Sequence, residues 1–343
     1  MVVAADIGSH VTAGPPDGLD VLIVSVGATT GWRAAARELH GAFDRAGARV
    51  LSVETGPVRD VRTFMLTDLV QAVAARRAAA RAVAAHRPIA VVYCSITAAL
   101  LWPRPGVIWL DTIAAENRPG RHGLWQRPVE RRRLAHAPML LTMAPSSLAP
   151  LGAEARADAV VVPVAVQRSG PLDARRDIDV LAYAADPVKR RLTDILDAWQ
   201  RARRDGETLV VTGIDTGERL PGVRFAGRVP VEEYRALLRR ARVFAAAPRR
   251  EDFGIGALEA LADGAMLVTT PAPGPYAALT LARRLDSRLV SEDLAPALRA
   301  ALDDPVAGYA RRAAELVAPF SRDAVTATIS QRVLPRLLPG WGA

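Results

Sequence analysis

Two glutamates, eight positions apart, flank a stretch of the sequence that could do chemistry. Glu251 precedes and Glu259 follows a turn at Gly254, where a loop passes into a helix predicted to begin near Ile255 and end at Gly264. Carboxylates only accept hydrogen bonds and so suit hydroxyl-rich ligands. The free amides of a helix N-terminus suit a phosphate. Because a buried carboxylate without partners is costly, Glu259 must either face solvent or hold hydrogen-bond donors.

The residues around these glutamates resemble a known family. The interval from Glu251 to Glu259 contains Phe253-Gly254-Ile255, and residues 258–265 read LEALADGA. Both features are similar to the E-x7-E motif and its continuation in retaining glycosyltransferases of the GT-B fold, in the large family-four type (glycosyl transferases group 1). The spacing alone is common, and the flanking residues make it specific. The competing interpretation is a surface helix that carries two unrelated carboxylates.

The resemblance implies a reaction and a set of site residues. The reaction is transfer of a sugar from a nucleoside-diphosphate-sugar to an acceptor hydroxyl, with retention of anomeric configuration, no metal and no cofactor. In the family's arrangement, Glu251 holds sugar hydroxyls beside the developing cation and Glu259 holds the ribose diol. The resulting donor-binding candidates in this stretch are Asp252, Phe253, Gly254, Ile255 and Glu259, with Glu251 as the catalytic candidate.

Basic residues that follow a strand predicted over Asp179–Ala184 resemble half of the family's diphosphate clamp. Lys189 matches the family's lysine, while Tyr183 stands where the family has its arginine. Arg190, at a glycine position of the pattern, could hold phosphate oxygens bidentately. Arg228 lies in a stretch similar to the turn beside the nucleotide base and completes the donor-binding candidates. The alternative is that these are ordinary basic residues at turns.

The first half of the chain offers weaker candidates. The strand predicted over Asp20–Val26 runs into a turn that contains Gly27 and Gly31, followed by a helix from Trp32 to Asp44. Such a turn can accept an anion, although it lacks the G-x-G-x-x-G spacing of a dinucleotide site. The two glycines either approach donor phosphate or acceptor, or serve the geometry of the turn alone.

An acidic residue follows the strand predicted over Val107–Leu110. Because ligands bind at the carboxyl ends of strands in such sheets, Asp111 emerges where a site is expected. Family members often have a histidine near this point. Asp111 either positions an acceptor hydroxyl or caps a loop, and His122 either replaces the missing imidazole or is simply exposed.

The order of predicted elements indicates two α/β domains. Strands and helices alternate along 343 residues, which suits two doubly wound parallel sheets. By resemblance, the fold is GT-B, with two Rossmann-like domains facing a central cleft. The boundaries are residues 1–168, a linker over 169–177, residues 178–318, and a C-terminal helix over 319–343 that crosses back. A strand over 160–166 closes the first domain, a long helix covers 320–338, and residues 1–18 form a loose tail.

Composition limits the other classes of function. The net charge is +9, and runs such as Glu130-Arg131-Arg132-Arg133 are predicted to be solvated faces that could also attract anionic lipid or nucleotide diphosphates. Nucleic-acid binding is unsupported, since no zinc-finger spacing or aromatic RNA-binding pattern occurs. Cys94, the single cysteine, is predicted to be a buried thiol and excludes an intramolecular disulfide. No D-x-D metal motif is found.

The expected location is cytoplasmic, since neither a signal sequence nor an apolar span of membrane length is apparent. Peripheral association with the inner face of the membrane stays open. The acceptor, whether glycan, lipid or small molecule, is undetermined, as are the donor sugar and base.

Two other functions compete with glycosyl transfer. The first is a GT-B sugar-nucleotide enzyme of another type, such as an epimerase; a phosphorylase would need a pyridoxal-binding lysine, which we do not identify. The second is a non-catalytic partner subunit that keeps the fold. It is retained because the diphosphate clamp is half missing and the histidine is absent.

Overall fold

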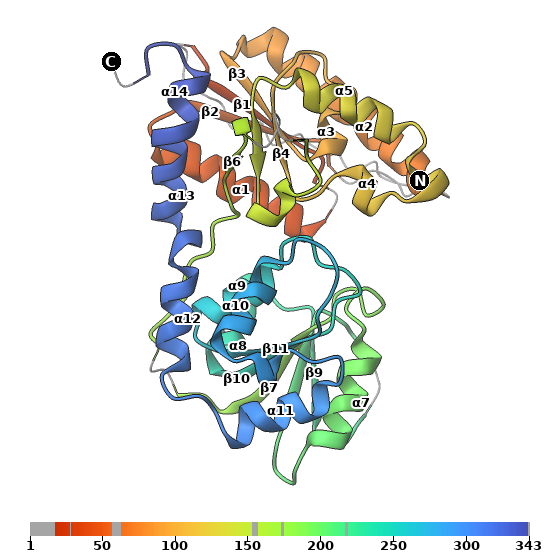
Figure 1. Cartoon of the computed structure of the whole chain (residues 1–343), viewed down its shortest axis with the longest axis vertical. Helices are drawn as coiled ribbons and strands as arrows, with labels where there is room; N and C mark the ends of the chain where they lie inside the picture. The colour runs from red at the N-terminus through yellow and green to blue at the C-terminus, as the bar shows by residue number, and fades with distance from the viewer. Residues whose placement is uncertain are drawn as a thin grey trace, which may run out of the picture. The chain divides into compact units, whose positions relative to one another are not determined.

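The computed structural model describes residues 18–27, 29–56, 63–152, 157–172, 175–216 and 219–341. The predicted tail therefore lies outside the described residues apart from Gly18, as do Asp173 and Ala174 of the predicted linker. The chain divides into two compact units (Figure 1). The first unit ends at Ala165 and resumes at Arg322, and the second unit is Val166–Ser321. Each unit contains one parallel sheet.

The sheet of the first unit has six strands in the order β2-β1-β3-β4-β5-β6, all parallel. They are β1 (Val21–Ser25), β2 (Val50–Glu54), β3 (Ala90–Cys94), β4 (Val107–Leu110), β5 (Leu140–Thr142) and β6 (Val160–Val161). The order reverses between β1 and β3, as in flavodoxin-like sheets. The strand predicted over 160–166 was too long, because only its first two residues pair with β5.

Trp109 of β4 helps to hold the chain directly beyond β6 close to the sheet. Its ring is fully buried and its Nε1 donates to the carbonyl oxygen of Val162 at 2.7 Å. A tryptophan that donates to the backbone satisfies both its own N–H and the carbonyl of an unpaired segment. Cys94 at the end of β3 is buried as predicted, and burial raises the pKa of its thiol.

Helices follow most strands of the first unit. They are α1 (Thr30–Arg45), α2 (Phe64–His86), α3 (Ile96–Ala99), α4 (Ala114–Asn117) and α5 (Gln126–His136), with 3-10 turns η1 (Gly120–Gly123) and η2 (Pro145–Leu148). Thr29 and Thr63 cap the first two through side-chain oxygens, as N-cap residues do. The unit ends in α13 (Arg322–Thr328), the π-helical η5 (Ile329–Val333) and α14 (Leu334–Leu337). The long helix predicted over 320–338 is therefore observed from Arg322 to Leu337, with a π-helical turn at its centre.

The sheet of the second unit has five parallel strands in the order β11-β10-β7-β8-β9. They are β7 (Ile178–Tyr183), β8 (Leu209–Thr212), β9 (Val223–Gly227), β10 (Ala241–Ala246) and β11 (Met266–Thr269). This is the Rossmann order, which reverses between β7 and β10. Ligands of such sheets bind where the strand order reverses, so a binding site is expected at the loops that follow β7 and β10.

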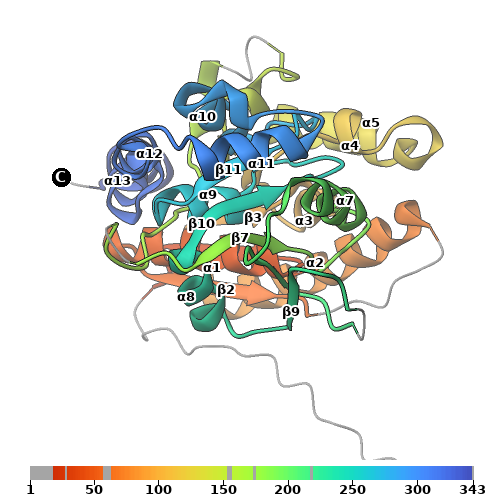
Figure 2. The same ribbon diagram turned by 90° about the horizontal axis from the view of Figure 1, so that it is seen from below.

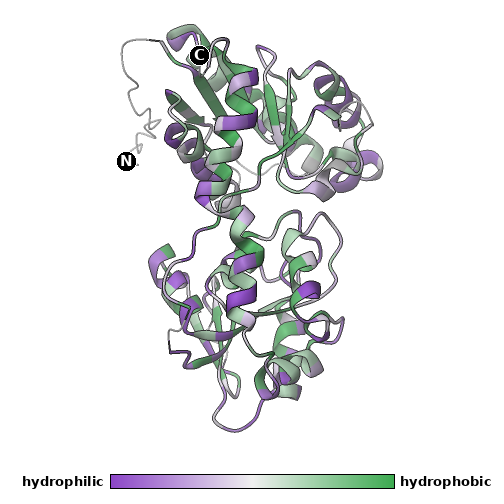
Figure 3. Cartoon of the chain, turned by 60° about the vertical axis from the view of Figure 1, so that its left-hand side comes forward, coloured by the Kyte–Doolittle hydropathy of each residue, from purple (hydrophilic) through white to green (hydrophobic). Residues whose placement is uncertain are grey.

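Helices cover both faces of this second sheet. Figure 2 shows α8 and α11 on opposite sides of it. The helices are α7 (Leu192–Ala202), α8 (Val231–Arg240), α9 (Ile255–Ala262), α10 (Ala277–Leu285), α11 (Leu294–Asp303) and α12 (Tyr309–Val317), with 3-10 turns η3 (Ser287–Leu289) and η4 (Ala318–Phe320). In both units the hydrophobic residues gather on the strands (Figure 3), as the burial of parallel strands on two faces requires. Among the described residues, no helix is both long and apolar enough to cross a bilayer.

Candidate functional site

The two loops at the point of strand-order reversal in the second unit are joined to each other. Lys189 and Arg190 follow β7, and Glu251 follows β10, which pairs directly with β7. The backbone N–H of Arg249 donates to the carbonyl oxygen of Lys189 at 2.9 Å. The guanidinium of Arg190 donates to the Glu251 carboxylate, and the two form an ion pair. The structure therefore joins the loop of Lys189 and Arg190 to the loop of Glu251, which follows about sixty positions later in the sequence.

Two glycines allow the chain to fold closely around Glu251, which is only 9% exposed. Gly254 has a φ of +88°, and a β-carbon there would lie 2.5 Å from the ring of Tyr276. Gly274 has a φ of +108°, and a β-carbon there would overlap the Glu251 carbonyl oxygen. Only glycine adopts such backbone angles without strain. The turn that the sequence predicted at Gly254 thus needs glycine both for conformation and for space.

Helix α9 begins directly after this turn, at the predicted residue Ile255. Its N-cap is Gly254, which has no side chain that could hydrogen-bond to the amides of the first turn. The neighbouring candidates anchor the approach to the helix. Phe253 is buried against Phe320, with ring centroids 6.0 Å apart, and Asp252 pairs with Arg250 at 2.7 Å. The N-terminal amides of α9 are consequently available for an anion.

Glu259 lies further along α9 and is held by Arg235 of α8. The Glu259 carboxylate accepts from Arg235 Nη1 at 2.7 Å, which confirms the prediction that Glu259 holds donors if it does not face solvent. Arg235 also donates to Asp263 at 2.8 Å and to the carbonyl oxygen of Gln167 at 2.9 Å. Burial alone would lower the pKa of Arg235, but Glu259 and Asp263 outweigh burial and the pKa lies above its usual range.

Aromatic rings connect the two acidic positions. The Arg190 guanidinium lies over the Tyr183 ring at 5.9 Å, and this ring packs edge-on against Tyr234 at 5.8 Å. Loss of hydration raises the pKa of the Tyr234 phenol, and the nearby Glu259 adds to the shift. Tyr183 stands where the family's pattern has an arginine, and its ring stabilises the position of the Arg190 guanidinium through a cation–π contact.

The remaining candidates of the second unit are solvent-exposed. Lys189 is exposed, and its ammonium forms no hydrogen bond or ion pair with any residue that the structure describes. It is also the only lysine among the 45 basic residues of the sequence. Arg228, after β9, is exposed and likewise makes no side-chain bond within the described part of the chain. Lys189 belongs to the loop that carries Arg190, whereas Arg228 is not drawn into this group.

The glycine candidates of the first unit have separate roles. Gly27 has a φ of +58°, its carbonyl accepts from Arg33 Nη1 at 2.9 Å, and a β-carbon there would overlap Glu54. Gly31 does not lie in the turn, because α1 begins at Thr30, two residues earlier than predicted. The early start follows from Thr29, whose hydroxyl caps the helix by accepting from Trp32 N at 3.1 Å.

Asp111 and His122 also lie on different elements. Asp111 follows β4 and is half-buried; its Oδ1 accepts from Thr112 N at 2.7 Å, and its carbonyl accepts from Ser147 Oγ at 2.5 Å. His122 is exposed within η1. The Asp111 side chain thus bonds to the adjacent backbone, which is the geometry of a loop cap.

Sequence reasoning missed two charged residues, the half-buried Arg235 and the buried Glu130. Arg235 could have been anticipated, since Glu259 and Asp263 stand four positions apart on one helical face and a buried pair of acids requires a cation. Glu130 was predicted to belong to a solvated face, which is wrong, because it is 2% exposed and accepts from Ala114 N at 2.7 Å. Burial raises the pKa of Glu130 to about 7.

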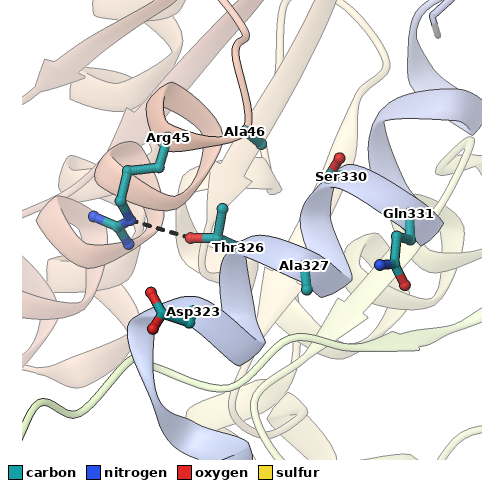
Figure 4. A pocket seen from close by; sticks show the side chains of 7 residues that line it. All are labelled: Arg45, Ala46, Asp323, Thr326, Ala327, Ser330 and Gln331. Atoms are coloured by element: carbon teal, nitrogen blue, oxygen red, sulfur yellow. Dashed lines mark hydrogen bonds between the residues drawn. The ribbon is translucent and has the colours of Figure 1, made fainter.

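A hollow of about 540 Å³ opens on the first unit between the end of α1 and the C-terminal helices (Figure 4). Arg45 Nε donates to Thr326 Oγ1 across it at 3.1 Å. The other lining residues are Ala46, Asp323, Ala327, Ser330 and Gln331. None of the predicted site residues lines this hollow, so it is separate from the group around Glu251.

The second unit matches a known family. Residues 179–304 match the model of the family described as Glycosyl transferases group 1. This range runs from the second residue of β7 to the end of α11 and contains Lys189, Arg190, Glu251 and Glu259. A comparison of the sequence with curated proteins gave no match.

Solved structures match the whole fold. Anabaena Alr3699/HepE, solved in complex with UDP-glucose, has a TM-score of 0.63 at 13% identity, over 90% of this chain and 97% of that chain. Sucrose-phosphate synthase from Thermosynechococcus elongatus scores 0.61 at 15% identity, over 92% and 98%. The UDP-forming α,α-trehalose-phosphate synthase from Burkholderia xenovorans scores 0.60 at 14%, over 90% and 97%. At these identities the likeness shows the fold, and the predicted GT-B fold with two Rossmann-like sheets is confirmed.

Proposed function

We propose that this chain, which has the GT-B fold and carries a group 1 glycosyltransferase domain over residues 179–304, transfers a sugar from a nucleoside-diphosphate-sugar to an acceptor hydroxyl. Anomeric configuration is retained, and neither a metal nor a cofactor is required. The observation that supports this most strongly is the junction at Gly254: a helix N-terminus flanked by Glu251 and Glu259, beside the loop of Lys189 and Arg190.

The diphosphate binds to the amides at the start of α9 and to Lys189. The helix N-terminus offers N–H groups and a partial positive charge, and the Lys189 ammonium, which no described residue pairs, adds a full one. Both stabilise the charge that develops on the departing diphosphate, as a metal ion would. In a chain whose other basic residues are all arginines, a lone lysine at this turn fits a specific contact to phosphate.

The two glutamates hold the sugars on either side of the diphosphate. Glu259, fixed by Arg235, accepts hydrogen bonds from the ribose diol. Glu251, fixed by Arg190, accepts from donor-sugar hydroxyls and lies near the positive charge that develops at the anomeric carbon. Arg190 thereby acts through Glu251, which distinguishes this chain from the family's pattern of an arginine that binds phosphate directly.

In the reaction, the bond between the anomeric carbon and the diphosphate oxygen breaks while the acceptor oxygen bonds to the same face of that carbon. The acceptor proton passes to the departing diphosphate oxygen, so charge and atoms balance without a protein base. Asp111, at the end of β4, is proposed to contact the acceptor hydroxyl. The acceptor class, whether glycan, lipid or small molecule, is an outcome of the assay.

The test has two stages. Thermal-shift screening against nucleoside diphosphates and their sugars identifies the base and the donor. Incubation of that donor with acceptor panels follows, and proton NMR of the product reports the anomeric configuration. A product with retained anomeric configuration supports the proposal, and an inverted product contradicts the proposed retention. Activity that depends on added divalent metal and is lost with chelator contradicts the proposed metal independence.

A non-catalytic role is the second candidate, favoured by one observation. Arg190 already neutralises Glu251, so among the described residues of this loop Lys189 is the cation left for the diphosphate, where the family's pattern has two. A non-catalytic subunit would bind nucleotide without hydrolysing the donor or transferring its sugar. An epimerase would release free nucleotide in the absence of any acceptor.

A further inference from the structure

The positive charge of the chain is concentrated in one stretch of the first unit. Residues 63–138 contain eleven arginines and four acids, whereas the rest of the sequence has 34 basic and 32 acidic residues. Two of the four acids are buried: Asp68 is paired with Arg118 at 2.7 Å, and Glu130 caps the start of α4. The surface of this stretch is consequently much more cationic than that of the remaining chain.

Helix α2 combines this charge with exposed apolar side chains on one face. Leu66, Leu69 and Val70 are 42%, 39% and 40% exposed. At 100° per residue, they lie on the same side of the helix as the exposed Arg77 and Arg81. The opposite side, which includes Ala72, Ala75 and Ala79, is buried. The outer side of α2 is therefore apolar in its first turns and cationic farther along.

The segment before α5 extends the apolar end of this surface. Leu124 is 61% exposed, and the adjoining Trp125 donates through Nε1 to the carbonyl oxygen of Met65 at 3.3 Å. Arg118 and Gln126 both donate to Asp68 of α2, at 2.7 and 3.1 Å. These bonds hold Leu124 beside the first turns of α2. We call Leu66, Leu69, Val70, Leu124, Arg77 and Arg81 the α2 face.

From this arrangement we infer that the α2 face docks on a bilayer that contains anionic phospholipid. Arginines next to a membrane gain from the negative surface potential, and apolar side chains gain by entering the interface. A nucleic acid would match the charge but leave the four apolar side chains in water. The guanidinium groups of Arg77 and Arg81 form no bond with any residue in the described ranges, so both are available to phosphate headgroups.

This docking surface lies outside the group around Glu251 and does not depend on the proposed reaction. Sedimentation of the full chain with vesicles tests it, using phosphatidylcholine alone and phosphatidylcholine mixed with phosphatidylglycerol. We expect binding to the mixed vesicles only, and less binding as salt rises. Failure of the full chain to bind mixed vesicles at low salt overturns the inference, whatever the outcome of the transfer assays.

Three variants separate the contributions. Arg77→Glu/Arg81→Glu should lower vesicle affinity by at least about tenfold, and Leu66→Ser/Leu69→Ser/Val70→Ser should lower it while leaving the charge intact. Arg283→Glu/Arg284→Glu, an exposed arginine pair of α10, changes the net charge equally and should leave binding unchanged. Equal loss in this control means unspecific attraction and overturns the inference.

Vesicle binding at the wild-type level by Leu66→Ser/Leu69→Ser/Val70→Ser also overturns the inference. So does competition in which RNA displaces the vesicles and binds the wild type and this variant equally well. Thermal unfolding of each variant, with and without nucleoside diphosphate, verifies that the fold is intact.

Discussion

The carboxyl ends of the two sheets differ in how their candidate residues are held. In the second unit, Arg190 and Arg235 reach across from other elements to fix Glu251 and Glu259. In the first unit, Asp111 bonds to its own neighbouring backbone and Gly27 serves a tight turn. Carboxylates fixed by arginines from separate elements are preorganised for a ligand, whereas a residue bonded to its own loop mainly shapes that loop. The contrast supports the proposal that the second unit recognises the donor.

Removing Arg235 should have the largest effect. Arg235→Ala leaves Glu259 and Asp263 without their shared cation, and Asp263 is fully buried. Breaking such a buried pair costs about 3–5 kcal/mol in free energy of unfolding, to be measured by urea denaturation. Arg239→Ala, one turn along α8, removes exposed hydrogen bonds to Ser169 and should cost less than about 1 kcal/mol. Equal losses of unfolding free energy for the two variants would show that the contacts of Arg235 with Glu259 and Asp263 stabilise the fold no more than an exposed hydrogen bond does.

Glu259→Ala tests the second unit's role in binding. We expect affinity for nucleoside diphosphate to fall roughly 100-fold, since about two charge-assisted hydrogen bonds to the ribose are lost. Isothermal titration calorimetry measures this effect. Asp111→Asn, at the corresponding edge of the first sheet, should leave nucleotide affinity unchanged. If instead Asp111→Asn weakened binding and Glu259→Ala did not, the assignment of the two units would be reversed.

Glu130 gives the first unit a pH-dependent stability. Its pKa of about 7 in the folded protein lies above the ordinary glutamate value of 4.5, so folding favours the protonated form. This stabilisation is present at acidic pH and is lost as the pH rises through about 7, on the order of 2 kcal/mol. Unfolding of the wild type at pH 5 and pH 8 should reveal the loss. Glu130→Gln should abolish it, and an unchanged pH profile in that variant would disprove the assignment.

Lys189→Ala should have the smallest effect of the four. The lysine is exposed, and loss of one exposed charge next to a phosphate should weaken nucleotide affinity about tenfold, or about 1.4 kcal/mol. Lys189→Arg retains the charge and should recover most of the affinity. Calorimetry at two salt concentrations checks the electrostatic origin, since the deficit of Lys189→Ala should shrink as salt rises.

The parts of the fold that could be predicted from sequence are those encoded locally. The turn at Gly254, the start of α9 at Ile255 and the need of Glu259 for donors follow from residues within one stretch. The alternation of strands and helices predicted two parallel sheets.

Features that depend on distant pairing were not predictable in this way. The Arg190–Glu251 pair joins residues sixty-one positions apart, and it forms only because β10 pairs with β7. Likewise, the apolar run from Val160 to Val166 has the composition of a strand, but β5 pairs with only two of its residues. The π-helical turn Ile329–Val333 keeps a helical pattern of apolar residues, so periodicity alone could not separate it from an α-helix.

The presence of a single lysine allows the most direct test of the Gly254 junction as a diphosphate site. Reductive methylation with ¹³C-formaldehyde labels only the Lys189 amine and the chain's N-terminal amine, and the two are distinguished in Lys189→Arg. We predict that the nucleoside diphosphate selected by thermal shift displaces the Lys189 methyl signal in the wild type, and that this displacement disappears in Glu259→Ala. A Lys189 signal that stays in place while calorimetry reports saturated nucleotide binding would contradict the account.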